Sequence, residues 1–300
     1  MKILVTGSRG FVGTRLIPRL KAAGHQVTGF DADSIDVSDS PRVRAFVERS
    51  CPEAVVHLAA VAFVPAAAKD PGLAQRVNVH GTQNVIDALE AHAPKARLLL
   101  VGSGEQYRAV EPNAPALTED APLDPQGSYA TTKAAAERLG QQAADRGLDV
   151  VTIRAFNHTG PGQAPLFVAP DFARQIALIE AGSPPLMRVG NLESVRDFLH
   201  VDDVIEAYLK LLDRQTPAGT YNIASGVGTR IGALLDALAQ LAGVTPKIER
   251  DDDRWRPADS RVGNAKRLRE ATGWRASRSL ETTLFELLVY WRNRIKEENN

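Results

Sequence analysis

The sequence is poor in cysteine and has no excess of charge. Cys51 is the only cysteine among 300 residues, so an internal disulfide and a cysteine-based metal cluster are both excluded. The 36 basic residues balance the 36 acidic ones, so the chain has no broad attraction to nucleic acid or to an anionic membrane. We therefore expect no nucleic-acid partner, no membrane partner and no metal. An anionic substrate would have to be bound by local charges.

Long hydrophobic runs are also lacking. No apolar segment approaches the roughly 20 residues that span a bilayer. The stretch Met1 to Val5 leads directly into a glycine-rich turn, without the core of a signal peptide. Together with the single cysteine, these features predict a soluble protein of the reducing cytoplasm. Apolar residues still make up 44% of the chain, which is enough for a substantial core.

Short apolar runs alternate with longer helical patterns through the first half of the chain. Strands are predicted at 3–5, 26–30, 54–58, 97–101 and 150–154, and helices at 12–23, 75–91 and 129–145. Continuous apolar strands between helices indicate a parallel sheet that is covered on both faces. The predicted fold class is therefore α/β, a doubly wound parallel sheet of the Rossmann type.

The pattern changes after Thr159, where Gly160-Pro161-Gly162 interrupts it. A helix at 202–212 and a strand at 220–223 indicate a return to the first sheet, whereas amphipathic helices at 231–242 and 280–295 belong to a second part. We predict a dinucleotide-binding Rossmann domain at 1–160 with a return segment at about 196–224. A smaller α/β substrate-binding domain would comprise 161–195 and 225–300.

A glycine-rich turn, Thr6-Gly7-Ser8-Arg9-Gly10-Phe11-Val12-Gly13, joins the first strand to the first helix. Gly7, Gly10 and Gly13 permit a tight turn and the close approach of a pyrophosphate, and the helix N-terminus supplies free N–H groups. This context predicts a dinucleotide site. Asp31, at the end of the second strand, can accept hydrogen bonds from a ribose and repel a 2′-phosphate, which favours NAD over NADP. Arg9 favours NADP, because a guanidinium in this loop could bind that phosphate.

Tyr129 and Lys133 are four residues apart on a predicted helix, so their side chains share one face. An ammonium beside a phenol stabilises phenolate and lowers the tyrosine pKa from about 10. This pair is suited to proton exchange with an alcohol while a hydride moves. Ser103 closes the fourth strand, at the edge where parallel sheets bind ligands, and could hydrogen-bond the substrate oxygen.

The G-x-x-G-x-x-G spacing and the ordered set Ser103, Tyr129 and Lys133 resemble the short-chain dehydrogenase/reductase superfamily. The resemblance implies that Ser103 binds the substrate oxygen, that Tyr129 exchanges the proton, and that Lys133 lowers the tyrosine pKa and holds the nicotinamide ribose. Further cofactor contacts are expected at Phe11, Val12, Asp36, Val37, Leu58, Ala59, Ala60 and Asn78.

The second half of the chain resembles GDP-4-dehydro-6-deoxy-D-mannose reductases, extended members of that superfamily in the NAD-dependent epimerase/dehydratase family. The similar segments are 154–163, 171–176, 189–198, 255–259 and 268–274. The resemblance implies reduction of the 4-keto group of a nucleotide-linked 6-deoxysugar by NAD(P)H, with GDP-4-dehydro-6-deoxy-mannose as the expected substrate. It also implies a homodimer built through a four-helix bundle.

Substrate contacts are expected in these same segments. Arginine forks suit a diphosphate, an asparagine amide suits a phosphate, sugar or base edge, and a carboxylate suits ribose hydroxyls. The expected contact residues are Asn157, Arg174, Val189, Asn191, Arg196, Arg256 and Asp259.

Two alternatives to a reductase stay open: a dehydratase or epimerase, and a sensor without turnover. Glu105 is either a solvated loop acid or, as in the similar GDP-mannose 4,6-dehydratases, a base that removes a proton from the sugar. A 4,6-dehydratase or a 4-epimerase with tightly bound NAD is therefore the second interpretation, although the chain lacks the long arginine-rich insertion of those dehydratases. A sensor without turnover is the third, and it would have no use for Tyr129.

The chain also departs from the reductases that it resembles. Ala62, Phe63 and Ala67 stand where those relatives usually carry serine or histidine, and Arg108 replaces a glycine. This departure predicts a less polar sugar pocket, shaped for a different or a deoxygenated sugar.

Overall fold

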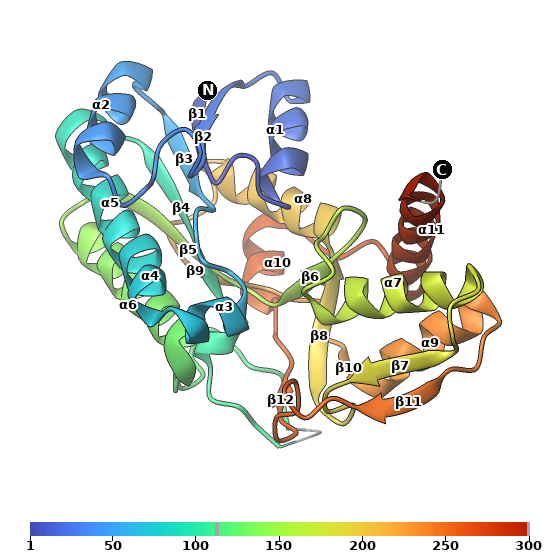
Figure 1. Ribbon diagram of the computed structural model, residues 1–300. Helices are drawn as coiled ribbons and strands as arrows, with labels where there is room; N and C mark the ends of the chain where they lie inside the picture. Colours follow the sequence, from blue (N-terminus) through green and yellow to red (C-terminus); the bar gives the residue numbers. More distant parts are fainter. Residues whose placement is uncertain (112–113, 299–300) are drawn as a thin grey trace.

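The computed structural model describes residues 1–111 and 114–298, and a six-stranded parallel sheet forms its centre (Figure 1). The strand order is β2 (Gln26–Phe30), β1 (Lys2–Thr6), β3 (Ala54–His57), β4 (Arg97–Ser103), β5 (Asp149–Ala155) and β9 (Gly219–Ile223). Because β1 lies between β2 and β3, the connections after β1 and β3 leave in opposite directions and open a crevice at their carboxyl ends. The predicted doubly wound α/β fold is confirmed.

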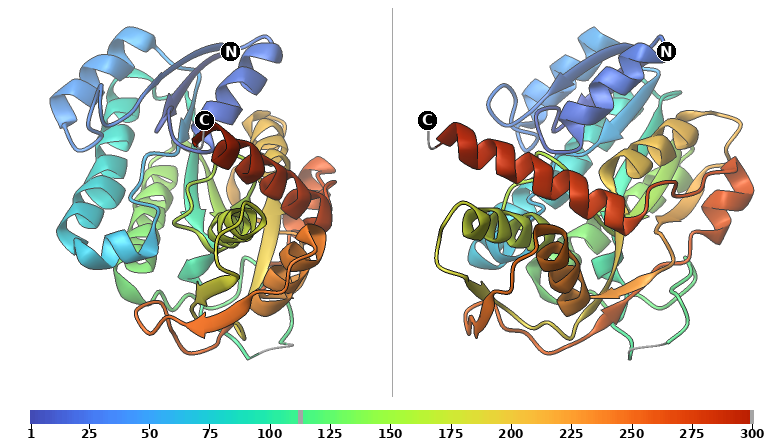
Figure 2. Two further views of the ribbon diagram at one scale, coloured as in Figure 1. Left: turned by 45° about the vertical axis from the view of Figure 1, so that its right-hand side comes forward. Right: turned by 90° about the vertical axis from the view of Figure 1, so that its right-hand side faces the viewer.

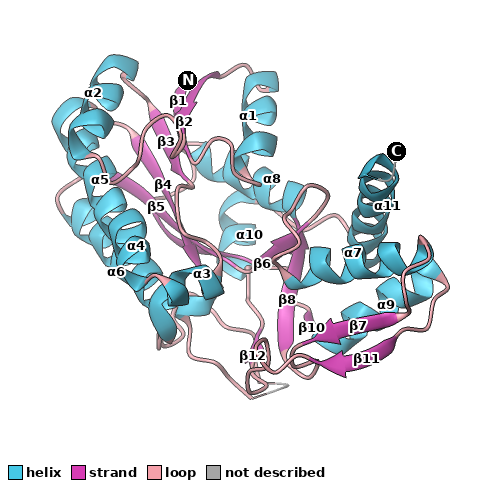
Figure 3. Ribbon diagram, in the orientation of Figure 1, coloured by secondary structure: helices cyan, strands magenta, loops and turns pink. Residues whose placement is uncertain are grey.

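Helices cover both faces of this sheet (Figures 1 and 3). One face carries α1 (Gly13–Ala22), α8 (Val201–Leu212) and α10 (Lys266–Thr272), and the other carries α2 (Ser40–Ser50), α5 (Gly81–His92) and α6 (Gly127–Asp145). In β1, Ile3 and Val5 pack toward the first set of helices, whereas Leu4 packs toward the second. Successive side chains of a strand point to opposite faces, so a strand covered on both sides is apolar throughout.

The second part of the chain lies beside the carboxyl edge of the sheet (Figure 2). Its helices α7 (Val168–Glu180), α9 (Ile231–Ala242) and α11 (Leu280–Glu298) pack around buried side chains such as Phe172, Leu235 and Leu288. Two small sheets complete it. In one, β7 (Leu186–Val189) pairs with β11 (Lys247–Arg250), and in the other, β8 (Val195–His200) pairs with β6 (Asn157–Thr159), β10 (Gly228–Arg230) and β12 (Ser260–Arg261).

The chain returns to the first sheet through α8 and β9. The domain boundaries drawn from the sequence stay a prediction. Among the described helices, none combines the length and the apolar character needed to cross a bilayer.

The structure also contains elements that the sequence analysis did not predict. The helix expected at 75–91 is built from α4 (Pro71–Gln75), a π-helical turn η1 (Arg76–His80) and α5, and it follows the short helix α3 (Val64–Lys69). Within η1, Asn78 accepts a hydrogen bond from the N–H of Val61 at 2.7 Å, so the widened turn directs this amide at the loop after β3. The strands β6, β10 and β12 have only two or three residues, too few to show an alternating pattern.

Replacing Arg97 by methionine should destabilise the fold by about 3 to 5 kcal/mol, because several buried acceptors would lose their donor. The Arg97 side chain is buried, pairs with Asp149 at 2.9 Å and donates to three carbonyl oxygens at the end of α8 and in the following loop. Urea unfolding measures the change. R108M is the matched control, since the Arg108 side chain is 65% exposed and its loss should change stability by less than about 0.5 kcal/mol. Equal effects of the two substitutions would contradict this account.

Candidate active site

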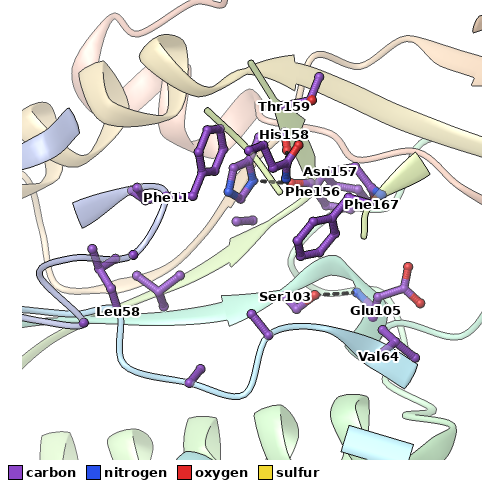
Figure 4. Close-up of a pocket in the computed structure, with 18 of the residues that line it drawn as sticks. Phe11, Leu58, Val64, Ser103, Glu105, Phe156, Asn157, His158, Thr159 and Phe167 are labelled. Carbon is purple, nitrogen blue, oxygen red and sulfur yellow. Dashed lines mark hydrogen bonds between the residues drawn. The ribbon is translucent and has the colours of Figure 1, made fainter. Parts of the chain in front are cut away.

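A cavity of about 530 Å³ lies at the carboxyl edge of the sheet (Figure 4). Parallel strands all end at this edge, so loops far apart in the sequence meet there. The walls come from the loops after β1, β3, β4 and β5, together with α6, α7, α8 and β8. The predicted site residues that line the cavity are Gly7, Gly10, Phe11, Val12, Gly13, Leu58, Ala59, Ala60, Ser103, Glu105, Tyr129, Lys133 and Asn157.

The turn after β1 presents backbone rather than side chains to the cavity. Gly7 has a φ of +67°, and a Cβ there would lie 2.9 Å from the backbone nitrogen of Ala59. A Cβ at Gly13 would lie 2.5 Å from the carbonyl oxygen of Gly7. No described side chain caps the start of α1. The N–H groups of Thr14 and Arg15 donate to the carbonyl oxygens of Gly10 and Val12, whereas those of Phe11, Val12 and Gly13 have no partner among the described residues and remain available as donors. A bound pyrophosphate needs both this close backbone approach and these donors.

Two buried polar atoms of the cavity wall, Thr159 Oγ1 and Gln163 Oε1, have no hydrogen-bond partner among the described residues. The two residues are 1% and 7% exposed. The Gln163 amide nitrogen donates to the carbonyl oxygen of His158 at 3.1 Å, so the amide oxygen is left as an acceptor. Buried polar atoms are normally paired. These two therefore fit a ligand that brings amide or hydroxyl groups, such as the nicotinamide half of a dinucleotide.

Ser103 ends β4 and begins a short 3-10 turn, η2 (Gly104–Gln106). Its Oγ accepts a hydrogen bond from the N–H of Glu105 at 3.1 Å, and its own N–H donates to Gln106 Oε1 at 2.9 Å. Gln106 in turn donates to Glu137 of α6, and Glu137 pairs with Arg154 of β5. The serine hydroxyl is therefore positioned by a reciprocal cap that is anchored to two other elements.

Tyr129 and Lys133 both reach the cavity from the start of α6. Lys133 Nζ donates to the carbonyl oxygen of Val101 at 2.7 Å, and burial lowers the lysine pKa to about 8. Burial raises the pKa of Tyr129 to about 12; a hydrogen bond to Ser103 opposes this rise and the Glu105 carboxylate adds to it. The expected lowering of the tyrosine pKa is therefore wrong for this geometry, because desolvation outweighs the stabilisation of phenolate. A phenol with a raised pKa keeps its proton at neutral pH.

Four charged side chains form a closed cluster beside the cavity. Arg196 lies 2.7 Å from Asp259 and 3.6 Å from Glu105. Arg261 pairs with Asp259 and lies 3.3 Å from Glu105. Two guanidiniums and two carboxylates cancel in net charge. Glu105, expected as a possible base, is thus bound by two cations, and Arg196, expected to bind phosphate, is already paired.

Arg9 and Asp31, which favour opposite cofactors, form an ion pair outside this cavity. Arg9 Nη2 lies 2.9 Å from Asp31 Oδ1 and 2.7 Å from Asp33 Oδ2. The hydrogen bond from Arg9 lowers the pKa of Asp31. A ribose hydroxyl at Asp31 or a 2′-phosphate at Arg9 would each compete with this pair.

Three further residues expected at the cofactor do not line the cavity. Asn78 is buried and holds the backbone of Val61, so it shapes the loop after β3 rather than the wall itself. Val37 is buried beneath Gly81, where a Cβ would lie 2.5 Å from Val37 Cγ1. The exposed carboxylate of Asp36 accepts hydrogen bonds within its own turn.

The residues expected at the nucleotide lie on neighbouring elements of the second part. Asn191 Nδ2 donates to the carbonyl oxygen of Arg256 at 2.8 Å, so these two loops are joined. Val189 is buried at the end of β7. The Arg174 guanidinium lies 5.9 Å from the centre of the Trp291 ring of α11 and does not line the cavity.

Thr159, Gln163 and Arg261 were not predicted as site residues from the sequence. The first two stand in the segment 154–163 that carries the family resemblance. Arg261 follows Asp259 by two residues, a spacing that places both side chains on one side of an extended strand. These spacings were the signals available in the sequence.

Replacing Lys133 by methionine should abolish turnover and stabilise the fold at neutral pH. The pKa of this amine falls from 10.5 to about 8 on folding, which corresponds to about 3 kcal/mol against folding while the amine is charged. Since the folded state releases the proton first, the stability of the wild type rises between pH 8 and pH 10.5. The advantage of K133M should therefore be largest at neutral pH and shrink across that range.

Urea unfolding at a series of pH values measures this difference. The control is K95M, which removes an exposed lysine and should show no such pH dependence. A K133M variant that is no more stable than the wild type at neutral pH would contradict the account.

Comparisons with known proteins agree with this fold. Residues 3–224 match the NAD dependent epimerase/dehydratase family. GDP-6-deoxy-D-mannose reductase of Pseudomonas aeruginosa is 35% identical over 310 residues, covering 99% of each chain.

Two solved structures share the fold. RMD from Pseudomonas aeruginosa, complexed with NADPH, is 34% identical with a TM-score of 0.88, covering 98% of this chain and 100% of that one. UDP-glucose 4-epimerase of Thermus thermophilus, in complex with NAD, is 27% identical with a TM-score of 0.86, covering 97% of this chain and 99% of that one. The chain belongs to the NAD dependent epimerase/dehydratase family.

Proposed function

We propose that this protein is a reductase that transfers a hydride from NAD(P)H to the 4-keto group of a nucleotide-linked 6-deoxysugar, GDP-4-dehydro-6-deoxy-mannose. The observation that carries the proposal is Tyr129, a phenol with a raised pKa beside Ser103 on the cavity wall. A phenol that keeps its proton at neutral pH suits reduction, in which the sugar oxygen must gain a proton. The likeness to a GDP-6-deoxy-D-mannose reductase over nearly the whole chain supports the choice of sugar.

Each residue at the reacting end has one task in this proposal. Ser103 donates a hydrogen bond to the keto oxygen, and Tyr129 delivers the proton. The bound dinucleotide supplies the hydride. Lys133 holds the nicotinamide ribose, and Thr159 and Gln163 offer their unpaired atoms to the nicotinamide end. The glycine turn holds the pyrophosphate.

The other end of the site would bind the nucleotide. A diphosphate can compete with Asp259 and Glu105 for the guanidiniums of Arg196 and Arg261, because charge-assisted bidentate bonds to phosphate are strong. Asn157 lies on the cavity wall and can donate to a sugar or phosphate oxygen (Figure 4).

The base and its ribose would meet a neighbouring surface. Asn191 and Arg256, which are joined through a hydrogen bond, border it and can bind a base edge and a phosphate. Val189 ends β7 beside this surface, and its carbonyl oxygen, which accepts the N–H of Asp251 at 2.8 Å, keeps a second lone pair for a ligand.

A 4,6-dehydratase or 4-epimerase with tightly bound NAD is the second candidate. Glu105 stands two residues after Ser103, and the likeness to a UDP-glucose 4-epimerase keeps this chemistry in the family. Its carboxylate oxygens, however, face Arg261 at 3.3 Å and Arg196 at 3.6 Å, so Glu105 is engaged by cations rather than poised as a base. This arrangement favours the reductase.

We further propose a homodimer in the cytoplasm. Helices α5 and α6 pack side by side on the outer face of the sheet and offer a surface for a four-helix bundle with a second copy (Figure 1). A single exposed cysteine is compatible with a reducing compartment.

Tyr129→Phe should lower kcat by at least about a hundredfold, because the sugar oxygen loses its proton donor. Consumption of NADPH or NADH with GDP-4-dehydro-6-deoxy-mannose measures turnover, and fluorescence titration should show that the dinucleotide still binds. Incubation of the wild type with GDP-mannose alone is the control. A 4-keto sugar formed there without added cofactor would identify a dehydratase and refute the reductase.

Asp31→Asn should shift binding toward NADPH relative to NADH by roughly tenfold, because a carboxylate that repels a 2′-phosphate is removed and Arg9 keeps only Asp33 as its anionic partner. The dissociation constants of both dinucleotides, measured by fluorescence at one ionic strength, give the ratio. The control is D252N, which removes an exposed carboxylate that pairs with Arg250 in the second part. An unchanged ratio in D31N would show that Arg9 and Asp31 do not set the cofactor preference.

A further inference from the structure

A second cavity, of about 380 Å³, lies beyond the end of β9 and beside α10. It shares no lining residue with the active-site cavity. The ring of Phe156 lies between the two, because it lines the active-site cavity and packs against Gly263, which lines the second cavity. A ligand in the second cavity would therefore be separate from the dinucleotide and from the sugar.

Two arginines of this cavity have no anionic partner in the part of the chain that the structure describes. Arg269 of α10 and Arg275 both line the cavity, and none of its described lining residues is acidic. The nearest arginines before and after them in the chain are paired with aspartates, Arg267 at 2.9 Å and Arg278 at 3.3 Å. The unpaired positive charge of this region is therefore collected at the cavity.

The walls of the cavity are held in place by buried groups. The Asp197 carboxylate accepts hydrogen bonds from the N–H groups of Ser225 at 2.8 Å, Gly226 at 2.9 Å and Gly263 at 3.3 Å. Trp274 is 5% exposed, and its indole N–H donates to a carbonyl oxygen of α8 at 2.9 Å. Two loops and the end of α10 are thus fixed around one space, so the site is preformed.

Asn264 adds a neutral donor to the two guanidiniums. Its side-chain oxygen accepts the N–H of Lys266 at 2.8 Å, whereas its amide nitrogen has no acceptor among the described residues. Since Asn264 also lines the cavity, three donor side chains converge there. Such a set suits the oxygens of an anion.

We propose that this cavity is a second ligand site, which binds a phosphate group. A phosphate dianion matches the charge of Arg269 and Arg275, and the fork of each guanidinium can donate two hydrogen bonds to its oxygens. The volume leaves room for the small organic part of a phosphomonoester. The proposal goes beyond the reductase function and does not depend on it.

Titration calorimetry tests the site with two probes, inorganic phosphate and glycerol 3-phosphate. The whole chain is used with NADPH and GDP at saturating concentrations, so that the active site is occupied, and sodium chloride at the same ionic strength controls for screening. The wild type should bind at least one probe at one site per chain. R269M/R275M should weaken that binding by at least about tenfold, because two charge-assisted contacts are lost.

Two further variants complete the test. R108M/R294M is the matched control, since it removes two arginines that are 65% and 50% exposed and line neither cavity, and it should change the affinity by less than about twofold. A276E adds a carboxylate at an exposed position of the cavity and should abolish binding without disturbing the core. It therefore tests the site even if R269M/R275M is unstable.

The order of the two affinities identifies the source of the phosphate group. Tighter binding of glycerol 3-phosphate supports a phosphomonoester as the ligand, and tighter binding of inorganic phosphate supports the free ion. No saturable binding of either probe overturns the proposal, as does an affinity in R269M/R275M and A276E equal to that of the wild type. The reductase is tested separately by its turnover, so failure of this proposal leaves that function intact.

Discussion

The site depends on an ion pair between the buried Arg154 of β5 and Glu137 of α6, whose side chain is 12% exposed. Glu137 also accepts a hydrogen bond from Gln106, which fixes the turn that presents Ser103. Arg154 donates to the Tyr107 hydroxyl at 2.8 Å. Burial alone would lower the pKa of Arg154 and is the largest single influence on it, but Glu137 and Tyr107 together raise that pKa above its ordinary value. One pair of opposite charges thus joins the serine turn, the helix that carries Tyr129 and Lys133, and the central sheet. Breaking a buried pair leaves an uncompensated charge, so these elements keep their relation to one another.

Burial governs the chemistry of the site as much as its geometry. The same desolvation that raises the pKa of Tyr129 lowers that of Lys133, since each group is pushed toward its neutral form. A neutral phenol is a proton donor, which fits reduction. Lys133, whose pKa falls to about 8 on burial, lowers the stability of the fold while its amine is charged. Such perturbed groups are typical of functional sites, where activity is maintained against the stability of the fold.

The charged side chains near the two ends of the site are paired with one another. Arg9 with Asp31, and Arg196 with Arg261, Asp259 and Glu105, form clusters in which cations and carboxylates are already paired. A phosphate that bound there would have to displace a carboxylate. A ligand phosphate would therefore compete with the protein's own carboxylates for these guanidiniums. Such competition would select for groups that bind guanidinium better than a carboxylate does.

The sequence by itself determined the parallel sheet, the glycine turn after β1 and the chemical identity of Ser103, Tyr129 and Lys133, because strand burial and turn geometry leave local patterns. It did not reveal β6, β10 or β12, which are too short to show an alternation of apolar and polar residues. Only the tertiary structure decided that Arg261 meets Glu105, that Arg9 meets Asp31, and that burial raises the pKa of Tyr129. Charge pairing and desolvation depend on distances in space between residues far apart in the chain, and no local pattern encodes those distances.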